Sequence, residues 1–208
     1  MTSGAWPWIV IAGLGAFHGL NPGMGWLFAV ALGQHRQDRR IVWLSLLPIA
    51  AGHALSIAMT AGLLVLAGVL VDVRTVSVAA GLFLIGWAMF HWFYGARHRV
   101  RVGMRTGLAG LGLWSFLMAS AHGAGLMLWP VLVPLCFPGD VAAGAASPVV
   151  PALLGIGLHT LAMLGVTAAV AVSVYEWIGL AMLRHAWINL DLVWTVALVL
   201  AGMVLLVA

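Results

Sequence analysis

Long apolar runs separated by short polar connections fill the chain from end to end. Each run has at least about 20 residues, the length that an α-helix needs to cross a hydrocarbon core of about 30 Å. In lipid every backbone polar group needs an internal partner, and these runs are far too long for the strands of a barrel. We therefore expect an all-α integral membrane protein with six transmembrane helices, at about 7–32, 42–70, 75–95, 108–136, 149–174 and 187–207.

Composition supports a surface that faces lipid. Of the 208 residues, 64% are hydrophobic and 7% are charged, whereas soluble domains carry about 25% charged residues. No stretch is polar enough for a second domain, so we expect a single membrane domain over 1–208. The first run lacks a basic start and a small-residue cleavage site, and we expect it to remain as a helix. The only cysteine, Cys136, excludes an internal disulfide.

The positive charges predict an orientation. All nine basic residues are Arg, and eight of them lie in the first, third and fifth connections. By the positive-inside rule these connections are cytoplasmic, which leaves both termini extracytoplasmic in a bacterial-type inner membrane. Because the Arg residues lie in short loops between apolar runs, they indicate topology, and we expect the lipid bilayer and no nucleic acid as a partner.

Two short patterns recur in the same order in the two halves of the chain. His18-Gly19 in the first run matches His122-Gly123 in the fourth, and His53 in the second matches His159 in the fifth. The two histidines are 35 residues apart in the first half and 37 in the second. Three helices per half predict two inverted three-helix repeats, a construction that places a transporter's substrate site near the midplane. The repeats cover about 1–97 and 105–208.

The four repeated histidines are the candidate functional site. Each lies near the middle of its run, and ionisable residues at that depth usually mark an ion or substrate path. Neutral imidazole is also the commonest protein ligand for transition metals. The interpretation is that His18, His53, His122 and His159 surround one metal cation. The alternative is that they pack inside the bundle and bond neighbouring carbonyls.

The residues around these histidines define a candidate substrate path. A proline one turn after His18, flanked by glycines, predicts a broken helix with free carbonyls for a cation, or a simple kink with close packing. Met24, Met127 and Met163 each follow one of the histidines by four to six residues. Thioether sulfur suits Cu(I), but Met is also an ordinary apolar filler. The path comprises Asn21, Pro22, Gly23, Met24, Met127 and Met163.

Tryptophans near the ends of the runs indicate an interfacial aromatic belt rather than a cofactor cage. Those that we assign to the belt are Trp6, Trp8, Trp43, Trp92, Trp177 and Trp187, out of eleven in the chain.

The segment His18-Gly19-Leu20-Asn21-Pro22-Gly23-Met24 resembles the nickel/cobalt efflux branch of the NiCoT-like transporters, within the LysE-type exporter superfamily. The first helix of that branch carries a pattern like His-Gly-x-Glu-Pro-Gly-His, and Gly52-His53-Ala54 also looks like its second helix. The resemblance implies two inverted three-helix repeats and metal efflux. Asn21 and Met24 replace an acid and a histidine, which puts nickel and cobalt in doubt as substrates.

Together these observations favour a secondary transporter, in the efflux direction, of a transition-metal cation or of a small solute that uses a metal site. A membrane cytochrome with haem between histidine pairs and a His-liganded membrane metalloenzyme are the alternatives, along with an accessory protein that transports nothing. Phosphate loops, nucleophile elbows and zinc-protease motifs are missing from the sequence. A transporter is thus favoured over an enzyme, and the ion, its energy source and homo-oligomerisation are left open.

Overall fold

The computed structural model describes residues 4–94, 107–137, 148–178 and 190–207. Within these ranges every regular element is a helix, which confirms the all-helical prediction. The elements in chain order are α1 (Trp6–Leu20), η1 (Pro22–Met24), α2 (Trp26–Arg36), α3 (Arg39–Leu70), α4 (Val73–Tyr94), α5 (Leu108–Ala121), α6 (Ala124–Cys136), α7 (Val149–Ser173), η3 (Val174–Ile178) and α8 (Leu190–Val207).

Three helices are long and apolar enough to cross a membrane: α3, α4 and the continuous α7–η3 helix. The α5–α6 pair, bent by 61°, would be a fourth if it forms one span. The first and last apolar helices, α1 and α8, are shorter. Leu47 and Leu63 on α3 are 67% and 66% exposed. Large apolar side chains that point outward along a whole helix fit contact with lipid rather than water.

Two of the expected runs are broken in the middle. After α1 ends, the side chain of Asn21 accepts a hydrogen bond from the backbone N–H of Gly23 at 2.9 Å, and Pro22 begins the short η1 turn. Gly25 then takes φ = 123°, which a residue with a Cβ rarely adopts. The second break has Gly123 at φ = 65° between α5 and α6. Each break therefore lies at or just after a His-Gly pair.

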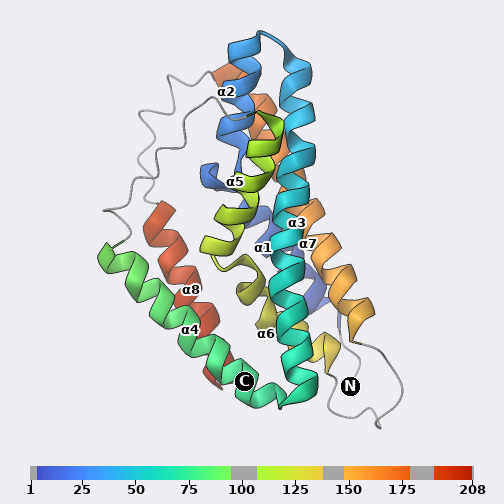
Figure 1. Cartoon of the computed structure of the whole chain (residues 1–208), viewed down its shortest axis with the longest axis vertical. Coiled ribbons are helices and arrows are strands. Elements are labelled where there is room, and N and C mark those ends of the chain that lie inside the picture. The colour runs from blue at the N-terminus through green and yellow to red at the C-terminus, as the bar shows by residue number, and fades with distance from the viewer. Residues whose placement is uncertain (1–3, 95–106, 138–147, 179–189, 208) are drawn as a thin grey trace.

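The helices pack mainly as three pairs, α1 on α7, α3 on α5 and α4 on α8 (Figure 1). Glycine permits each close approach. A Cβ added to Gly15 of α1 would collide with the carbonyl oxygen of His159, and one added to Gly52 of α3 would collide with that of Gly112. A Cβ on Gly81 of α4 would lie 2.8 Å from the carbonyl of Gly202. Such small-residue contacts are typical of membrane helices.

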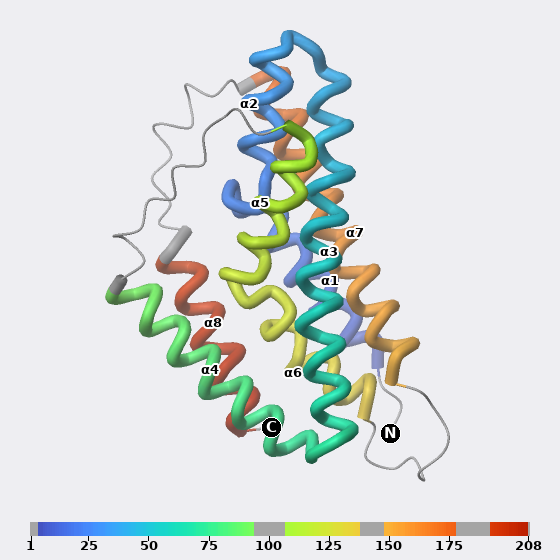
Figure 2. The backbone as a smooth tube through the Cα atoms, viewed as in Figure 1, coloured from blue at the N-terminus to red at the C-terminus, as the bar shows by residue number. Residues whose placement is uncertain are grey.

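The first two pairs each join one half of the chain to the other. Helix α1 of the first half packs on α7 of the second, and α5 of the second half packs on α3 of the first. The α4–α8 pair lies to one side of the other helices (Figure 2). The described ends of the chain and the α3–α4 corner lie at one end of the molecule, and the α2–α3 corner lies at the other (Figure 1).

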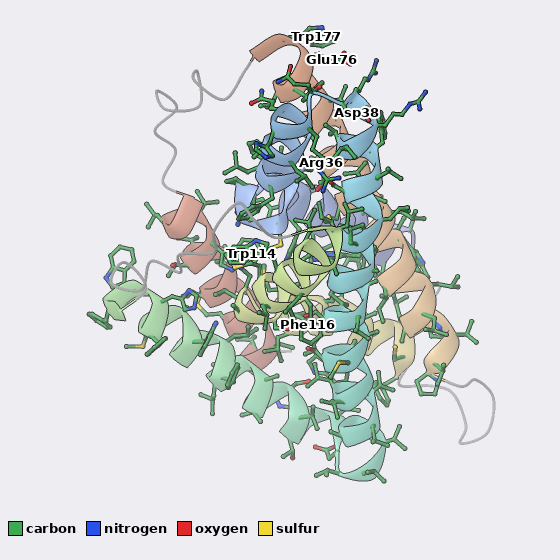
Figure 3. All side chains as sticks on the ribbon, turned by 45° about the horizontal axis from the view of Figure 1, so that its top comes forward. Arg36, Asp38, Trp114, Phe116, Glu176 and Trp177 are labelled. Atoms are coloured by element: carbon green, nitrogen blue, oxygen red, sulfur yellow. The ribbon has the colours of Figure 1, made fainter. Side chains whose placement is uncertain are left out.

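Charged side chains gather at the end of the molecule that holds the α2–α3 corner. Arg36, Asp38 and Glu176 lie there together (Figure 3). Asp38 caps α3 by accepting a hydrogen bond from the N–H of Arg40 at 2.8 Å, and Arg39 forms an ion pair with Glu176 at 2.8 Å. The ion pair joins the start of α3 to η3, and so joins the two halves at this end.

Candidate functional site

Three of the four predicted histidines converge in the middle of the bundle. His18 on α1, His53 on α3 and His159 on α7 are each 0% exposed. The ring centres of His18 and His159 are 4.9 Å apart, those of His53 and His159 are 5.5 Å apart, and those of His18 and His53 are 5.7 Å apart. We call these three residues the histidine trio. Two of them come from the first half of the chain and one comes from the second.

Most ring nitrogens of the trio have no hydrogen-bond partner. The Nδ1 of His18 lies 2.8 Å from the carbonyl oxygen of Leu14. A carbonyl only accepts, so Nδ1 carries the proton and Nε2 is left as a lone-pair donor. This Nε2 and both nitrogens of His53 and of His159 are buried and unpartnered. His159 also lies near the main chain of Ile11, outside hydrogen-bond geometry. Unpaired buried polar atoms are uncommon and destabilising, and a cluster of them in one place calls for a functional reason.

The fourth histidine, His122, lies at the second break and is half-buried. Its Nδ1 lies 2.7 Å from the carbonyl of Met118, the same contact that His18 makes with Leu14. The Trp194 ring of α8 contacts both His18 and His122, with ring centres 4.6 and 4.8 Å away. Among the described residues these two histidines make no ring contact, although they are close enough to interact electrostatically. The structure thus brings three of the four predicted ligands together and places the fourth across an indole.

The ring nitrogens of the trio are suitable ligands for a transition metal, but the rings are not oriented so that all three can bind one ion. Within the described residues, no group of three or more His, Cys, Asp or Glu is arranged to hold a metal. The rings of His53 and His159 are nearly parallel, at 4°, whereas His18 is inclined to them by 68° and 72°. A metal lies close to the plane of each imidazole that binds it. One ion bound by all three rings therefore requires at least one ring to turn.

The trio does not fit a haem. A bis-histidine haem needs the whole macrocycle between its two axial rings, but here the three rings contact one another directly. A hydrolytic metal centre would also need a general base nearby. The acidic side chains that the structure describes are Asp38, Asp72 and Glu176, and each lies at a helix end with a partner of its own.

At both breaks indole N–H groups donate to main-chain carbonyls, so the carbonyls that accept them are not free for a cation. Two donate at each break, over 2.7 to 3.1 Å. The pairs are Trp26 to Leu20, Trp114 to Gly23, Trp87 to Ala121 and Trp194 to His122. Because α1 and α5 stop inside the bundle, the carbonyls of their last turns need such partners.

These four tryptophans are not among those predicted from the sequence for the aromatic belt. Of the tryptophans predicted for the belt, Trp6, Trp43, Trp92 and Trp177 are about half or more exposed. Trp8 is instead partly buried and packs against the core, and Trp187 lies outside the described residues. The signal that was available is position within the run: a tryptophan far from a run's ends must find a partner for its N–H inside the protein. Trp26 and Trp194 are 6% and 4% exposed and do so.

The other predicted path residues lie close to the breaks or to the trio. The side-chain oxygen of Asn21 accepts a hydrogen bond from the backbone N–H of Gly23. The three methionines Met24, Met127 and Met163 are buried, at 0%, 3% and 0% exposure. Met163 lies one turn beyond His159 on α7, and its sulfur accepts a hydrogen bond from the Thr167 hydroxyl at 3.3 Å. The connections that hold most of the arginines, and with them His98 and His185, lie largely outside the described residues.

Comparisons of the chain with protein-family models, with curated proteins and with solved structures give no match. Its function therefore has to be argued from the residues and their geometry.

Proposed function

We propose that this protein is a membrane transporter that carries a transition-metal cation through the histidine trio. The observation that carries the proposal is the convergence of His18, His53 and His159 in the apolar interior, with five ring nitrogens lacking a hydrogen-bond partner. Packing alone does not account for this arrangement, because each unpaired buried nitrogen lowers stability. Metal cargo would use these lone pairs.

The proposal includes six spans in two inverted three-helix repeats. The exchange of α1 and α5 between the halves, and a break at a His-Gly pair in each half, support it. In this arrangement α1–α2 and α5–α6 are the two broken first helices of the repeats. The cytoplasmic side is the end that holds the α2–α3 corner and its arginines, in a bacterial-type inner membrane. Both termini then face outward, and the described ends of the chain lie together at the opposite end (Figure 1).

Alternating access follows from where the trio lies. Because His159 belongs to one half and His18 and His53 belong to the other, a rocking motion of the halves changes the distances among the three rings. The Arg39–Glu176 ion pair would close the cytoplasmic end in one state and open in the other. We take the direction to be outward, which is what the resemblance to the NiCoT-like efflux branch implies.

The test is metal flux into liposomes that contain the purified protein. Vesicles are exposed to Zn²⁺, Ni²⁺, Co²⁺ and Ag⁺ in turn, with Ag⁺ as a redox-stable probe for Cu⁺, and the internal metal is measured by mass spectrometry. We expect at least one ion to enter faster than into empty vesicles. His53→Ala and His159→Ala should each lower that flux by about tenfold or more, since even an outer-shell change at a metal site costs that much in affinity.

A matched control is His35→Ala, because His35 is exposed at the end of α2, whereas the trio is fully buried inside the bundle. This variant should transport like the wild type. All variants are compared at equal amounts of protein that elutes as a single species from a sizing column. If no ion moves faster than in empty vesicles, or if both trio variants transport as fast as the wild type, the proposed function is overturned.

A further inference from the structure

Among the side chains that the structure describes, none beside the trio carries a negative charge, and this bears on which cations the trio accepts. The described carboxylates are Asp38, Asp72 and Glu176. Asp38 caps α3, Asp72 accepts hydrogen bonds from the N–H and hydroxyl of Thr75, and Glu176 pairs with Arg39. All three are at helix ends, whereas the trio lies among side chains that are fully buried. No carboxylate of the described side chains therefore neutralises a cation bound by the trio.

The helix breaks do not supply the missing charge. The carboxyl end of a helix carries a partial negative charge and the amino end a partial positive one. At the first break the carboxyl end of α1 is followed within a few residues by the amino end of α2, and α5 and α6 repeat this at the second break. The opposed ends offset one another. The carbonyls of Leu20 and His122 also face indole N–H donors.

The energy required to bury an ion grows with the square of its charge, and an uncompensated charge in an apolar interior is strongly unfavourable. A doubly charged cation held only by neutral imidazoles is therefore penalised far more than a singly charged one. Among transition metals this selects the monovalent ions Cu⁺ and Ag⁺. Both are soft, and both are stable with few ligands, so His18 and one ring of the parallel pair are enough.

A residue with a soft side chain lies one helical turn from the trio, where its sulfur accepts a hydrogen bond from the Thr167 hydroxyl at 3.3 Å. Met163 is 0% exposed on α7, four residues after His159 and therefore on the same face of the helix. A Cβ on Gly19, which follows His18, would lie 2.5 Å from the carbonyl oxygen of Met163. Thioether sulfur favours Cu⁺ over borderline divalent ions. We infer that the cargo of the trio is a monovalent soft cation, Cu⁺ or its analogue Ag⁺, and that Met163 is a ligand on its path; this rests on the proposed function.

The experiment is a competition for transport. Liposomes containing the Cys136→Ala protein, which removes the one thiol, are given Ag⁺, Zn²⁺, Ni²⁺ and Co²⁺ together at equal concentration, and internal metals are measured at several times. We expect Ag⁺ to enter in large excess over the divalent ions. Met163→Leu keeps the apolar volume and removes the sulfur, and it should lower Ag⁺ entry by about tenfold. Met203→Leu, at a residue that is 45% exposed on α8, is the control and should leave entry unchanged.

The possible outcomes separate this inference from the proposed function. If a divalent ion enters in preference to Ag⁺ and its entry still depends on His53 and His159, the protein is a metal transporter and the monovalent assignment is overturned. If Ag⁺ is preferred but Met163→Leu matches Met203→Leu, the role of Met163 is overturned. If no metal entry depends on the trio, the proposed function falls, and the monovalent assignment falls with it.

Discussion

The indole N–H of Trp194 donates a hydrogen bond to the main-chain carbonyl of His122, with the two atoms 3.1 Å apart. The same indole contacts the imidazole of His18 at right angles, and Phe17 stacks on it with ring centres 5.4 Å apart. A single side chain of α8 thus joins the second helix break to the histidine trio. Because α8 packs mainly on α4, a movement of the α4–α8 pair would act on the break and on the trio together.

We expect Trp194→Phe to lower both stability and transport. Phenylalanine keeps an aromatic ring beside Phe17 but leaves the His122 carbonyl without its indole donor. An unsatisfied buried polar group costs about 1–3 kcal/mol, which thermal unfolding in detergent would detect as a lower midpoint. Metal flux should fall as well, since the break is less well fixed.

Trp92→Phe is the matched control for this prediction, because Trp92 is 60% exposed on α4. It should change neither the midpoint nor the flux. If Trp194→Phe behaves like Trp92→Phe, the hydrogen bond to His122 has no part in holding the break.

The apolar runs in the sequence locate the helices well, because in lipid the length and hydropathy of a run determine the helix almost alone. The depth of His18, His53 and His159 within their runs predicts that they lie at one level. That His122 contacts the Trp194 ring and makes no ring contact with His18 depends on the position of Trp194, which belongs to another helix. Helix neighbours are set by side-chain packing far along the chain, and the pattern of one run contains no information about them.

The tryptophans that donate to carbonyls at the first break also could not be predicted from the pattern of one run. Pro22 and its glycines predict that the first run breaks, and it does. They do not predict that the indole N–H groups of Trp26 and Trp114 donate hydrogen bonds to carbonyls of the break. Trp114 lies on α5, so its role appears only once α5 is placed against the first break.

His53→Leu should raise stability while it removes transport. Both ring nitrogens of His53 are buried without a hydrogen-bond partner, and leucine fills a similar volume without polar atoms. Removing the unpaired groups should stabilise the fold by about 1–3 kcal/mol, and the loss of a ligand should lower flux. The unfolding midpoint and the liposome assay together give the result.

Ser115→Ala provides the contrast for this prediction, because the Ser115 hydroxyl is buried and donates to the carbonyl of Ile49 at 2.9 Å. Removing a satisfied group should lower the midpoint. A fall in the midpoint for His53→Leu as well would mean that His53 is part of the packing rather than a functional residue kept at the expense of stability.

Gly15→Ala should separate α1 from α7. The added Cβ would collide with the carbonyl oxygen of His159 and would lie 3.1 Å from the Cβ of Ala162. Because the obstacle is backbone, a helix has to shift, and overpacking of this kind typically costs about 1–3 kcal/mol. The midpoint of thermal unfolding should fall accordingly, and the displaced His18 should reduce flux.

The same helix offers a control. A Cβ on Gly13 meets nothing within 4 Å, so Gly13→Ala should be neutral or slightly stabilising, since alanine is the better helix former. Equal effects of the two substitutions would contradict the close α1–α7 contact that brings His18 to His159.

The orientation can be tested with single cysteines at the two ends of α3. Over its 32 residues, α3 rises by about 48 Å at 1.5 Å per residue, so the corners before and after it should lie on opposite faces of a membrane. His35 is exposed just before the first corner, and Val71, at the second, is 70% exposed. In a Cys136→Ala background we expect a membrane-impermeant maleimide to label Val71→Cys in intact cells, because the arginine-poor connection faces outward. His35→Cys should be labelled only after the membrane is opened, and the Cys136→Ala parent not at all. Labelling of His35→Cys alone in intact cells would reverse the orientation and the inferred direction of export, whereas labelling of both from outside would show that α3 does not cross the bilayer.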